Sequence, residues 1–231
     1  METSLHRELK LRYAGHQART EVVLENYRID AVSRGRLIEI QHGSLSAIRD
    51  KIGRLLARHR VLVVKPIVRT KLLIKQPAPG RDANSRRISP KRGGLLDIFD
   101  ELVYFTRVFP HPRLALEVVL VDIEEWRYPG HGRRRRWRHN DHVVADQKLV
   151  AMGTSVRLRR PADLIKLLPA QLPAEFHTLA LAQLCDVRRD VAQRIAYCLR
   201  KMQAIERIGK QGNAILYRVA RSKSRRSDEA A

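Results

Sequence analysis

The fold of this chain is set by residues 27–43, which read Tyr-Arg-Ile-Asp-Ala-Val-Ser-Arg-Gly-Arg-Leu-Ile-Glu-Ile-Gln-His-Gly. Two apolar, β-rich segments flank a turn at Ser33–Gly35, so the pattern predicts a hairpin of two short strands. Because alternate side chains of a strand point to opposite faces, Ile38 and Ile40 are expected to enter a core. The polar positions of the second strand then share the other face.

Three polar side chains are expected to lie together on this hairpin. Glu39 and Gln41 project to the same side of the second strand, and the register suggested by the turn brings Asp30 near Glu39. Carboxylate and amide oxygens are the ligands that hard divalent cations prefer. In a chain of formal net charge +22, this predicts a divalent-metal site facing a polyanion. The alternative is a set of solvated residues on the polar face of an antiparallel sheet.

The composition favours a globular protein with an anionic partner. Of the 231 residues 44% are hydrophobic, and Lys and Arg number 46 against 24 acidic residues. Such an excess of positive charge favours nucleic acid as the partner. No apolar run approaches the roughly 18 residues of a membrane span, so no membrane is expected. Cys185 and Cys198 form no disulfide or metal-ligand pattern, and the N-terminus lacks a secretory signal, which indicates the cytoplasm.

Residues 1–75 are expected to form one structural unit. Apolar residues at spacings of three and four predict helices over 3–14 and 44–59. Besides the hairpin, the expected strands are Thr20–Leu24, Val61–Val64 and Val68–Lys75. The predicted order is therefore α-β-β-β-α-β, with one further strand after it.

Residues 76–160 form a basic extension. The composition of 76–94 is typical of a mobile loop. A helix is predicted at Leu95–Val108, a strongly apolar strand at Leu114–Ile123, and one or two strands within Val143–Arg159. These elements either continue the first sheet or form a separate domain, and the sequence leaves both possibilities open.

The pattern of residues 1–75 resembles the PD-(D/E)XK, or restriction-endonuclease-like, nuclease superfamily. Its common core is αβββαβ, with an Asp on the second strand and a Glu/Asp-x-Lys on the third. Asp30 and Glu39 match the two acids, and Gln41 stands where the family usually has Lys. Glu8 matches a helical Glu that some branches add to the metal site. The resemblance implies an α/β fold, with a mixed sheet and extra elements around a nuclease-like core.

The same resemblance implies hydrolysis of phosphodiester bonds with Mg²⁺ or Mn²⁺. Asp30 and Glu39 would bind the cation, which neutralises the phosphate and activates water. Without a cation their mutual repulsion would raise a carboxyl pKa. Gln41 would position the water but carries no positive charge, which Lys51 or Arg49 on the following helix would supply.

A basic aromatic segment follows residue 125. Trp126 and Trp137 lie on either side of an unbroken row of Arg133, Arg134, Arg135 and Arg136. Arginines beside aromatic rings suit phosphate contact and base stacking, so these arginines and Trp137 are predicted to bind nucleic acid. An exposed charged loop is the alternative explanation.

Residues 161–220 resemble a small winged-helix domain, and 221–231 are expected to be a frayed, disordered tail. Thr178–Leu184 and Asp190–Met202 have helix-turn-helix spacing, and a following hairpin supplies the wing. In such domains the second helix enters the major groove and the wing lies on the backbone. The predicted contacts are Arg188, Arg189, Gln193, Arg194, Tyr197, Arg200, Lys201 and, at the wing tip, Lys210. A protein–protein module is the alternative.

The expected function is Mg²⁺-dependent phosphodiester hydrolysis on double-stranded DNA, which the C-terminal region would orient. Cutting of both strands would be compatible with a homodimer. One alternative is a non-catalytic DNA-binding regulator or structural protein on a nuclease-like fold. Another is an RNA- or ribosome-associated protein, because positive charge alone does not distinguish DNA from RNA.

Overall fold

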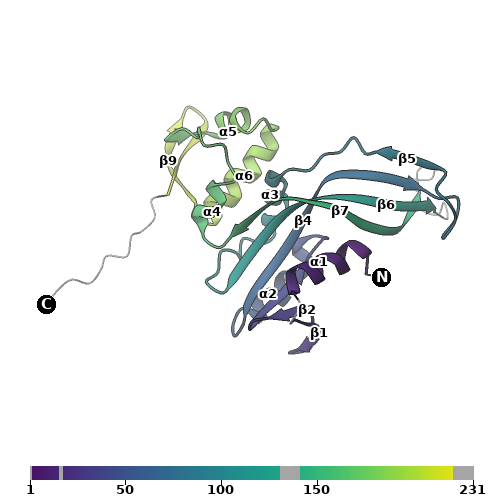
Figure 1. Cartoon of the computed structure of the whole chain (residues 1–231). Helices are drawn as coiled ribbons and strands as arrows, with labels where there is room; N and C mark the ends of the chain where they lie inside the picture. The colour runs from purple at the N-terminus through teal and green to yellow at the C-terminus, as the bar shows by residue number, and fades with distance from the viewer. Residues whose placement is uncertain (1, 16–17, 131–140, 221–231) are drawn as a thin grey trace.

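The computed structural model describes residues 2–15, 18–130 and 141–220 (Figure 1). A seven-stranded mixed sheet forms the larger part. Across it run β1 (Arg19–Leu24), β2 (Tyr27–Ser33), β3 (Arg36–Ile40), β4 (Arg60–Lys75), β6 (Leu114–Pro129) and β7 (His142–Leu158), while β5 (Ser85–Ile88) pairs with β4. β3, β4 and β6 are parallel to one another, and the other pairings are antiparallel.

The β2–β3 hairpin has the geometry predicted from its turn. Arg34 and Gly35 both have positive φ, at 49° and 70°, as the two-residue turns that match strand twist require. Ala31 pairs with Ile38, and the ladder between the two strands ends there. Beyond it the Ile40 backbone N–H donates to the side chain of Asp30. The register expected from the turn is therefore confirmed from Ser33–Arg36 to Ala31–Ile38.

Helices cover both faces of the sheet. On one face α1 (Ser4–Ala14) buries Leu5 and Leu9 against Ile38 and Ile40, as expected for the two isoleucines. On the other face lie the 3₁₀ turn η1 (Leu45–Ile48) and α2 (Arg49–Leu55), whose Ile52 is fully buried. The order α1, β1, β2, β3, α2, β4 is the expected αβββαβ. None of the helices among the described residues is long and apolar enough to cross a bilayer.

The helix predicted over 44–59 is shorter than its apolar spacing suggested. The segment begins with the 3₁₀ turn, and α2 itself has seven residues. Ser44 caps the turn by accepting a hydrogen bond from the Ser46 backbone. Gly53 lies within α2, where its backbone freedom disfavours a longer helix.

β4 is one long strand, whereas the sequence predicted two. It runs through Pro66, which pairs with Val119 of β6. β3 ends opposite Val64, so at Pro66 the strand has a ladder neighbour only on the β6 side among the described residues. Proline is tolerated at such an edge because a ladder donor is not needed on the open side.

Residues 76–158 continue the first sheet, which settles the question that the sequence left open. β5 lies within the stretch expected to be a loop, and β6 and β7 extend the sheet beyond β4. The helix predicted over 95–108 is reduced to the 3₁₀ turn η2 (Leu95–Asp97) and α3 (Ile98–Leu102). The chain then leaves the helix in turns that bury Phe105 and Phe109 completely, so core packing outweighs helix propensity there.

The C-terminal elements form a second, three-stranded antiparallel sheet with three helices. They are α4 (Pro161–Ile165), β8 (Glu175–Phe176), α5 (Thr178–Leu184), α6 (Arg189–Lys201), β9 (Ile205–Gln211) and β10 (Ala214–Val219), with strand order β8-β10-β9. The two helices and the hairpin predicted after Thr178 are confirmed. The two-residue strand β8 was not predicted, because only its pairing of Phe176 with Tyr217 makes it a strand.

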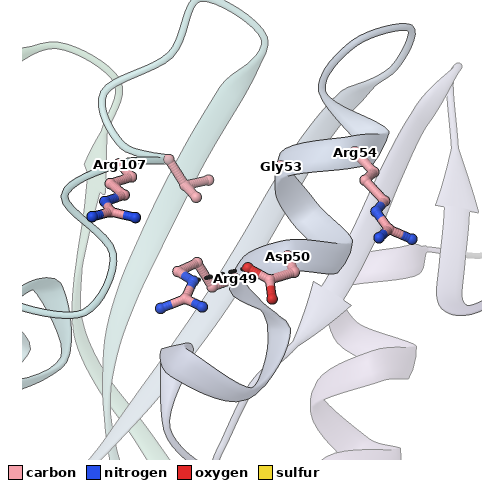
Figure 2. Close-up of a pocket in the computed structure, with 6 residues that line it drawn as sticks. Arg49, Asp50, Gly53, Arg54 and Arg107 are labelled. Atoms are coloured by element: carbon pink, nitrogen blue, oxygen red, sulfur yellow. Dashed lines mark hydrogen bonds and ion pairs between the residues drawn. The ribbon is translucent and has the colours of Figure 1, made fainter.

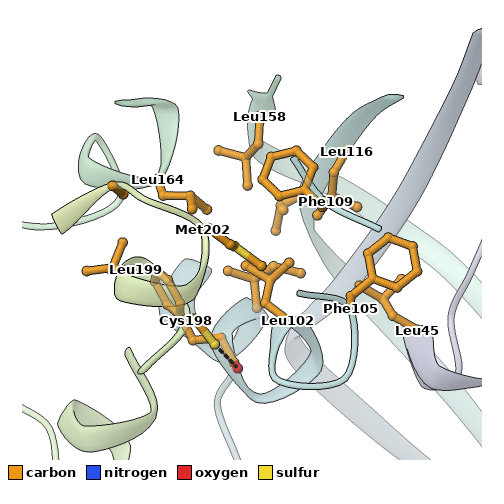
Figure 3. Packing of buried hydrophobic residues seen from close by; sticks show 14 of the residues in the cluster. Leu45, Leu102, Phe105, Phe109, Leu116, Leu158, Leu164, Cys198, Leu199 and Met202 are labelled. Carbon is orange, nitrogen blue, oxygen red and sulfur yellow. Dashed lines mark hydrogen bonds between the residues drawn. The ribbon is translucent and has the colours of Figure 1, made fainter. Parts of the chain in front are cut away.

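One continuous core joins these C-terminal elements to the large sheet. Figure 3 shows Leu102 and Phe109 of the α3 region packed beside Leu199 and Met202 from the end of α6. The Cys198 thiol also points to the Phe99 carbonyl at 3.6 Å. Because α6 packs on α3, the orientation of the C-terminal helices is fixed relative to the sheet.

Candidate functional site at the β2–β3 hairpin

Asp30 is held by groups from two different elements. One of its oxygens accepts a hydrogen bond from the Ile40 backbone N–H of β3 at 2.7 Å. The other lies 3.1 Å from Nε2 of His6 on α1. The carboxylate is therefore fixed in position, since both of its oxygens have partners.

Glu39 is buried beside a lysine from α2. Its residue is only 8% exposed, and Oε1 accepts a hydrogen bond from Lys51 Nζ at 2.5 Å. Lys51 also donates to the Arg28 carbonyl of β2 at 2.6 Å. The second oxygen, Oε2, is buried and has no hydrogen-bond partner among the described residues. A buried carboxylate oxygen without a partner is costly, and a cation or donor would satisfy it.

The two carboxyl groups have pKa values shifted in opposite directions. Burial works to raise the pKa of Asp30, but the hydrogen bonds from His6 and the Ile40 backbone outweigh it and hold the pKa below its ordinary value. Burial raises the pKa of Glu39, the negative charge of Asp30 raises it further, and Lys51 offsets only part of this. The pKa of Glu39 is thus raised mainly by burial, with a smaller part from its repulsion by Asp30.

The helical residue that contacts Asp30 is His6, and no contact brings the predicted Glu8 to this carboxylate in the described part of the chain. The Glu8 carboxylate pairs with Arg12 at 2.8 Å and its side chain is 41% exposed. Positions 6 and 8 lie about 200° apart around a helix, so only one of them can face Asp30 when Leu5 and Leu9 are buried. The hydrogen bond to Asp30 in turn raises the pKa of His6.

Gln41 follows the last residue of β3. Its backbone N–H donates to Val64 at 2.8 Å, and its side-chain amide donates to the Ser44 carbonyl at 2.8 Å. The amide therefore stabilises the turn after β3. This leaves the side-chain oxygen as the group with which Gln41 would contact a water molecule.

A buried ion pair that the sequence analysis missed fixes the same turn. Lys65 of β4 is 5% exposed and donates to the carbonyls of His42 and Gly43 as well as to Glu101 of α3. Burial lowers the pKa of Lys65. Glu101 accepts the Leu45 backbone N–H at 2.8 Å. The only sequence signal was a lysine inside the apolar run 61–68.

The donor set for a metal ion is limited to two carboxylates. Within 2–15, 18–130 and 141–220, no group of three or more His, Cys, Asp and Glu side chains converges as metal ligands. Asp30 and Glu39 both carry carboxylate oxygens, and Oε2 of Glu39 is buried without a hydrogen bond from the described residues. Carboxylate oxygens are the ligands that hard divalent cations prefer.

The predicted nucleic-acid contacts of the C-terminal region fall into two groups. Arg188 pairs with Asp190 at 3.0 Å, and Arg194 pairs with Asp190 at 3.2 Å and with Asp100 of α3 at 3.0 Å. Arg194 thus holds α6 on α3. The other predicted contacts are exposed and have no ion pair in the described part of the chain: Arg189, Gln193, Tyr197, Arg200 and Lys201 on α6, and Lys210 beside the β9–β10 turn. Arg133 to Arg136 and Trp137 lie outside the described residues.

Replacing His6 with Ala is expected to destabilise the fold most between about pH 4 and pH 6.5. The pKa of His6 is raised in the folded protein. Its contribution to stability is therefore complete below its ordinary pKa of 6.5 and is lost as pH rises through its folded pKa. The pKa of Asp30 is lowered in the folded protein. Its contribution to stability is therefore complete above its ordinary pKa of 3.8 and is lost as pH falls through its folded pKa. We expect a loss of about 1 kcal/mol in urea unfolding at pH 5.5, shrinking at pH 9.

His59 provides the control for this variant. Its ring lies 3.4 Å from the carboxylate of Glu25, and both side chains are more exposed than those of His6 and Asp30. His59→Ala should therefore change the unfolding free energy less than His6→Ala does. A His6→Ala loss that is the same at pH 5.5 and pH 9 would contradict a charged pair with Asp30.

Comparison with known proteins places the chain in a family whose activity is not described. The family model described as Domain of unknown function (DUF8091) matches residues 3–159. An uncharacterized protein of Treponema pallidum (strain Nichols) is 30% identical over 183 residues, which is 79% of this chain and 72% of that protein. No solved structure matches the chain. The chain therefore belongs to the DUF8091 family, and the matched region contains the large sheet together with Asp30, Glu39 and Lys51.

Proposed function

We propose that this protein binds nucleic acid and hydrolyses its phosphodiester bonds with Mg²⁺ or Mn²⁺. The observation that carries the proposal is the grouping of Asp30, Glu39 and Lys51 on an αβββαβ framework in a chain of net charge +22. The resemblance to PD-(D/E)XK nucleases implies two carboxylates at the second and third strands with a lysine beside them, and here that lysine would come from α2. Double-stranded DNA is the proposed substrate.

Each residue of the group has a distinct proposed role. Asp30 and Oε2 of Glu39 would hold the cation, which when bound neutralises charge on the phosphate and makes water a stronger nucleophile. The family usually has a lysine at the position of Gln41. Lys51 would supply that positive charge instead, because its ammonium group lies 2.5 Å from Glu39. It would stabilise negative charge that develops on the phosphate. His6 holds Asp30 in position, and the side-chain oxygen of Gln41 would orient the water.

The C-terminal elements are proposed to act as a winged helix that orients the duplex. α5 and α6 follow one another as a helix-turn-helix, and β9 and β10 form the wing. The exposed side of α6 carries Arg189, Arg200 and Lys201, and Lys210 lies beside the turn of the hairpin. These cations suit phosphate contacts on either side of the groove that α6 would enter.

Replacing Arg200 with Ala is expected to weaken DNA binding through the loss of one phosphate contact. Arg200 is exposed and has no ion pair among the residues that the structure describes. The plot of log binding constant against log salt concentration has a negative slope, and its magnitude should decrease by about 0.9. Fluorescence anisotropy with a labelled duplex at several salt concentrations measures this slope.

Arg194→Ala is the matched control, because it removes the same charge from the same helix. Arg194 is committed to Asp100 and Asp190, so its loss should lower the thermal midpoint while leaving the salt slope unchanged. Equal changes of slope in the two variants would show that the exposed side of α6 is not the DNA-contacting face.

A non-catalytic DNA-binding protein is the second candidate, and two observations favour it. The amide of Gln41 is engaged with the Ser44 carbonyl, and Lys51 already neutralises Glu39. Such a protein would bind DNA through the same basic surfaces without turnover. A protein that prefers RNA would use these surfaces as well.

Incubation of supercoiled plasmid and labelled oligonucleotides with Mg²⁺, Mn²⁺ or EDTA tests the proposed activity. We expect cleavage with either cation and none in EDTA. Intact substrate under all conditions, together with binding in EDTA, would favour the non-catalytic protein. Competition between duplex DNA and structured RNA at one salt concentration decides between the two nucleic acids.

A further inference from the structure

A pocket of about 380 Å³ lies beside α2, close to the proposed site. Its walls are Arg49, Asp50, Gly53 and Arg54 of α2, and Arg107 and Val108 from the turns between α3 and β6. Figure 2 shows Arg107 on the loop and Arg49 on the beginning of α2, with Arg54 farther along the helix. Two segments 50 to 60 residues apart in the sequence therefore contribute arginines to one pocket.

The pocket has a surplus of positive charge. Arg49, Arg54 and Arg107 line it together with one acidic residue, Asp50, which pairs with Arg49 at 2.9 Å. Figure 2 shows the guanidinium group of Arg54 on the other side of α2 from those of Arg49 and Arg107. Arg54 donates to the Tyr27 hydroxyl at 3.0 Å, a neutral partner. Arg107 has no hydrogen bond or ion pair within the described part of the chain. Guanidinium groups bind phosphate oxygens through paired N–H donors, so an anion with several oxygens suits this pocket.

The pocket and the proposed site share α2. Lys51 and Arg54 are three residues apart, which places their Cβ atoms about 5–6 Å apart on the helix surface. Lys51 donates to the carbonyl of Arg28 and Arg54 to the hydroxyl of Tyr27, so both side chains reach the beginning of β2. A nucleic-acid strand that follows α2 would meet both Lys51 and the pocket.

We propose that this pocket binds a backbone phosphate of the nucleic acid next to the phosphate at Asp30, Glu39 and Lys51. The proposal rests on the nucleic-acid function proposed above. Arg54 and Arg107 are exposed, which suits a phosphate belonging to a chain that runs over the surface. A small free anion would be held better by an enclosed site.

Arg107→Ala tests the pocket, with Arg86→Ala as the charge-matched control. Arg86 is exposed on β5, which pairs with the opposite end of β4. Binding of a fluorescein-labelled duplex is measured in EDTA at several salt concentrations, so that cleavage plays no part. We expect Arg107→Ala to reduce the log–log salt slope by about 0.9. Arg86→Ala should leave the slope unchanged, and both variants should keep the thermal midpoint of the wild type.

The outcomes separate this proposal from the proposed function. An unchanged slope in Arg107→Ala, or equal reductions in both variants, overturns the phosphate pocket even where the wild type binds and cleaves DNA. Saturable thermal stabilisation by inorganic phosphate that Arg107→Ala abolishes, with duplex binding unaffected, assigns the pocket to a free anion and also overturns it. No binding of any nucleic acid by the wild type removes both proposals.

Discussion

Asp30→Asn is expected to reduce Mg²⁺-dependent plasmid cleavage at least about a hundredfold, because it removes a charged ligand of the proposed cation. Asparagine keeps the size of the side chain and one acceptor oxygen, so the hydrogen bond from the Ile40 backbone at 2.7 Å can persist. Duplex binding in EDTA should be unchanged or slightly stronger, since a negative charge near the phosphate is lost. Gel analysis of plasmid nicking over time measures the rate.

Glu8→Gln is the control for this experiment. It also removes one carboxylate from this part of the protein, but that carboxylate pairs with Arg12 and is exposed. We expect full cleavage activity from Glu8→Gln. Equal activity of Asp30→Asn and the wild type would refute the assignment of the metal ligand, and equal loss in both variants would refute the choice of His6 over Glu8 as the helical residue.

Lys51→Met is expected to destabilise the fold by about 2–3 kcal/mol at pH 8, because it leaves the Glu39 carboxylate buried without the lysine ammonium group that pairs with it. The side chains of Lys51 and Glu39 are 16% and 10% exposed, so water can satisfy little of the lost interaction. Methionine retains the apolar part of the lysine chain, and the loss therefore reports on charge and hydrogen bonding. Urea unfolding followed by circular dichroism measures it.

The loss of unfolding free energy caused by Lys51→Met should increase with pH. The pKa of Glu39 is raised, so its contribution to stability is complete below its ordinary value of 4.5 and is lost as pH rises through the folded value. Without Lys51 the folded pKa rises further, which extends the loss to higher pH. Arg49→Met on the same helix should show no loss that grows with pH, because the pKa of Asp50 is lowered by Arg49 and any contribution of this exposed pair is complete above 3.8. A Lys51→Met loss independent of pH would contradict a buried charged pair.

The β2–β3 hairpin could be predicted because its information is local. The turn residues Arg34 and Gly35 adopt positive φ, and alternation of apolar and polar residues fixes which side chains are buried. These two features set the register and hence the neighbourhood of Asp30 and Glu39. The αβββαβ order followed from the same kind of local pattern.

The lengths of several elements could not be predicted from local patterns. β4 joins two apolar segments across Pro66 because β6 runs beside it on one edge. The helix after Leu95 ends early because Phe105 and Phe109 are needed in the core that α3 shares with α6. In each case a neighbour distant in the sequence outweighs the intrinsic preference of the segment.

The partners of the candidate site were the hardest to foresee. His6 and Asp30 are 24 positions apart, and Lys65 and Glu101 are 36 apart. His6 and Glu8 flank the buried stripe of Leu5 and Leu9 on opposite sides of α1, so which of them meets Asp30 depends on the side on which β2 lies. Arg107 reaches the pocket beside α2 only because the turns after α3 pack there.

Residue order alone established the hairpin, the position of its two acids and the strongly cationic character of the chain, because these depend on neighbours along the backbone and on composition. Packing in three dimensions selected Lys51 and His6 as the partners of the acids and committed Arg194 to α3. It also brought the arginines of α2 and Arg107 to one pocket. The physical reason is that a side-chain contact between separate elements depends on which faces are buried together, and that is settled only when the core closes.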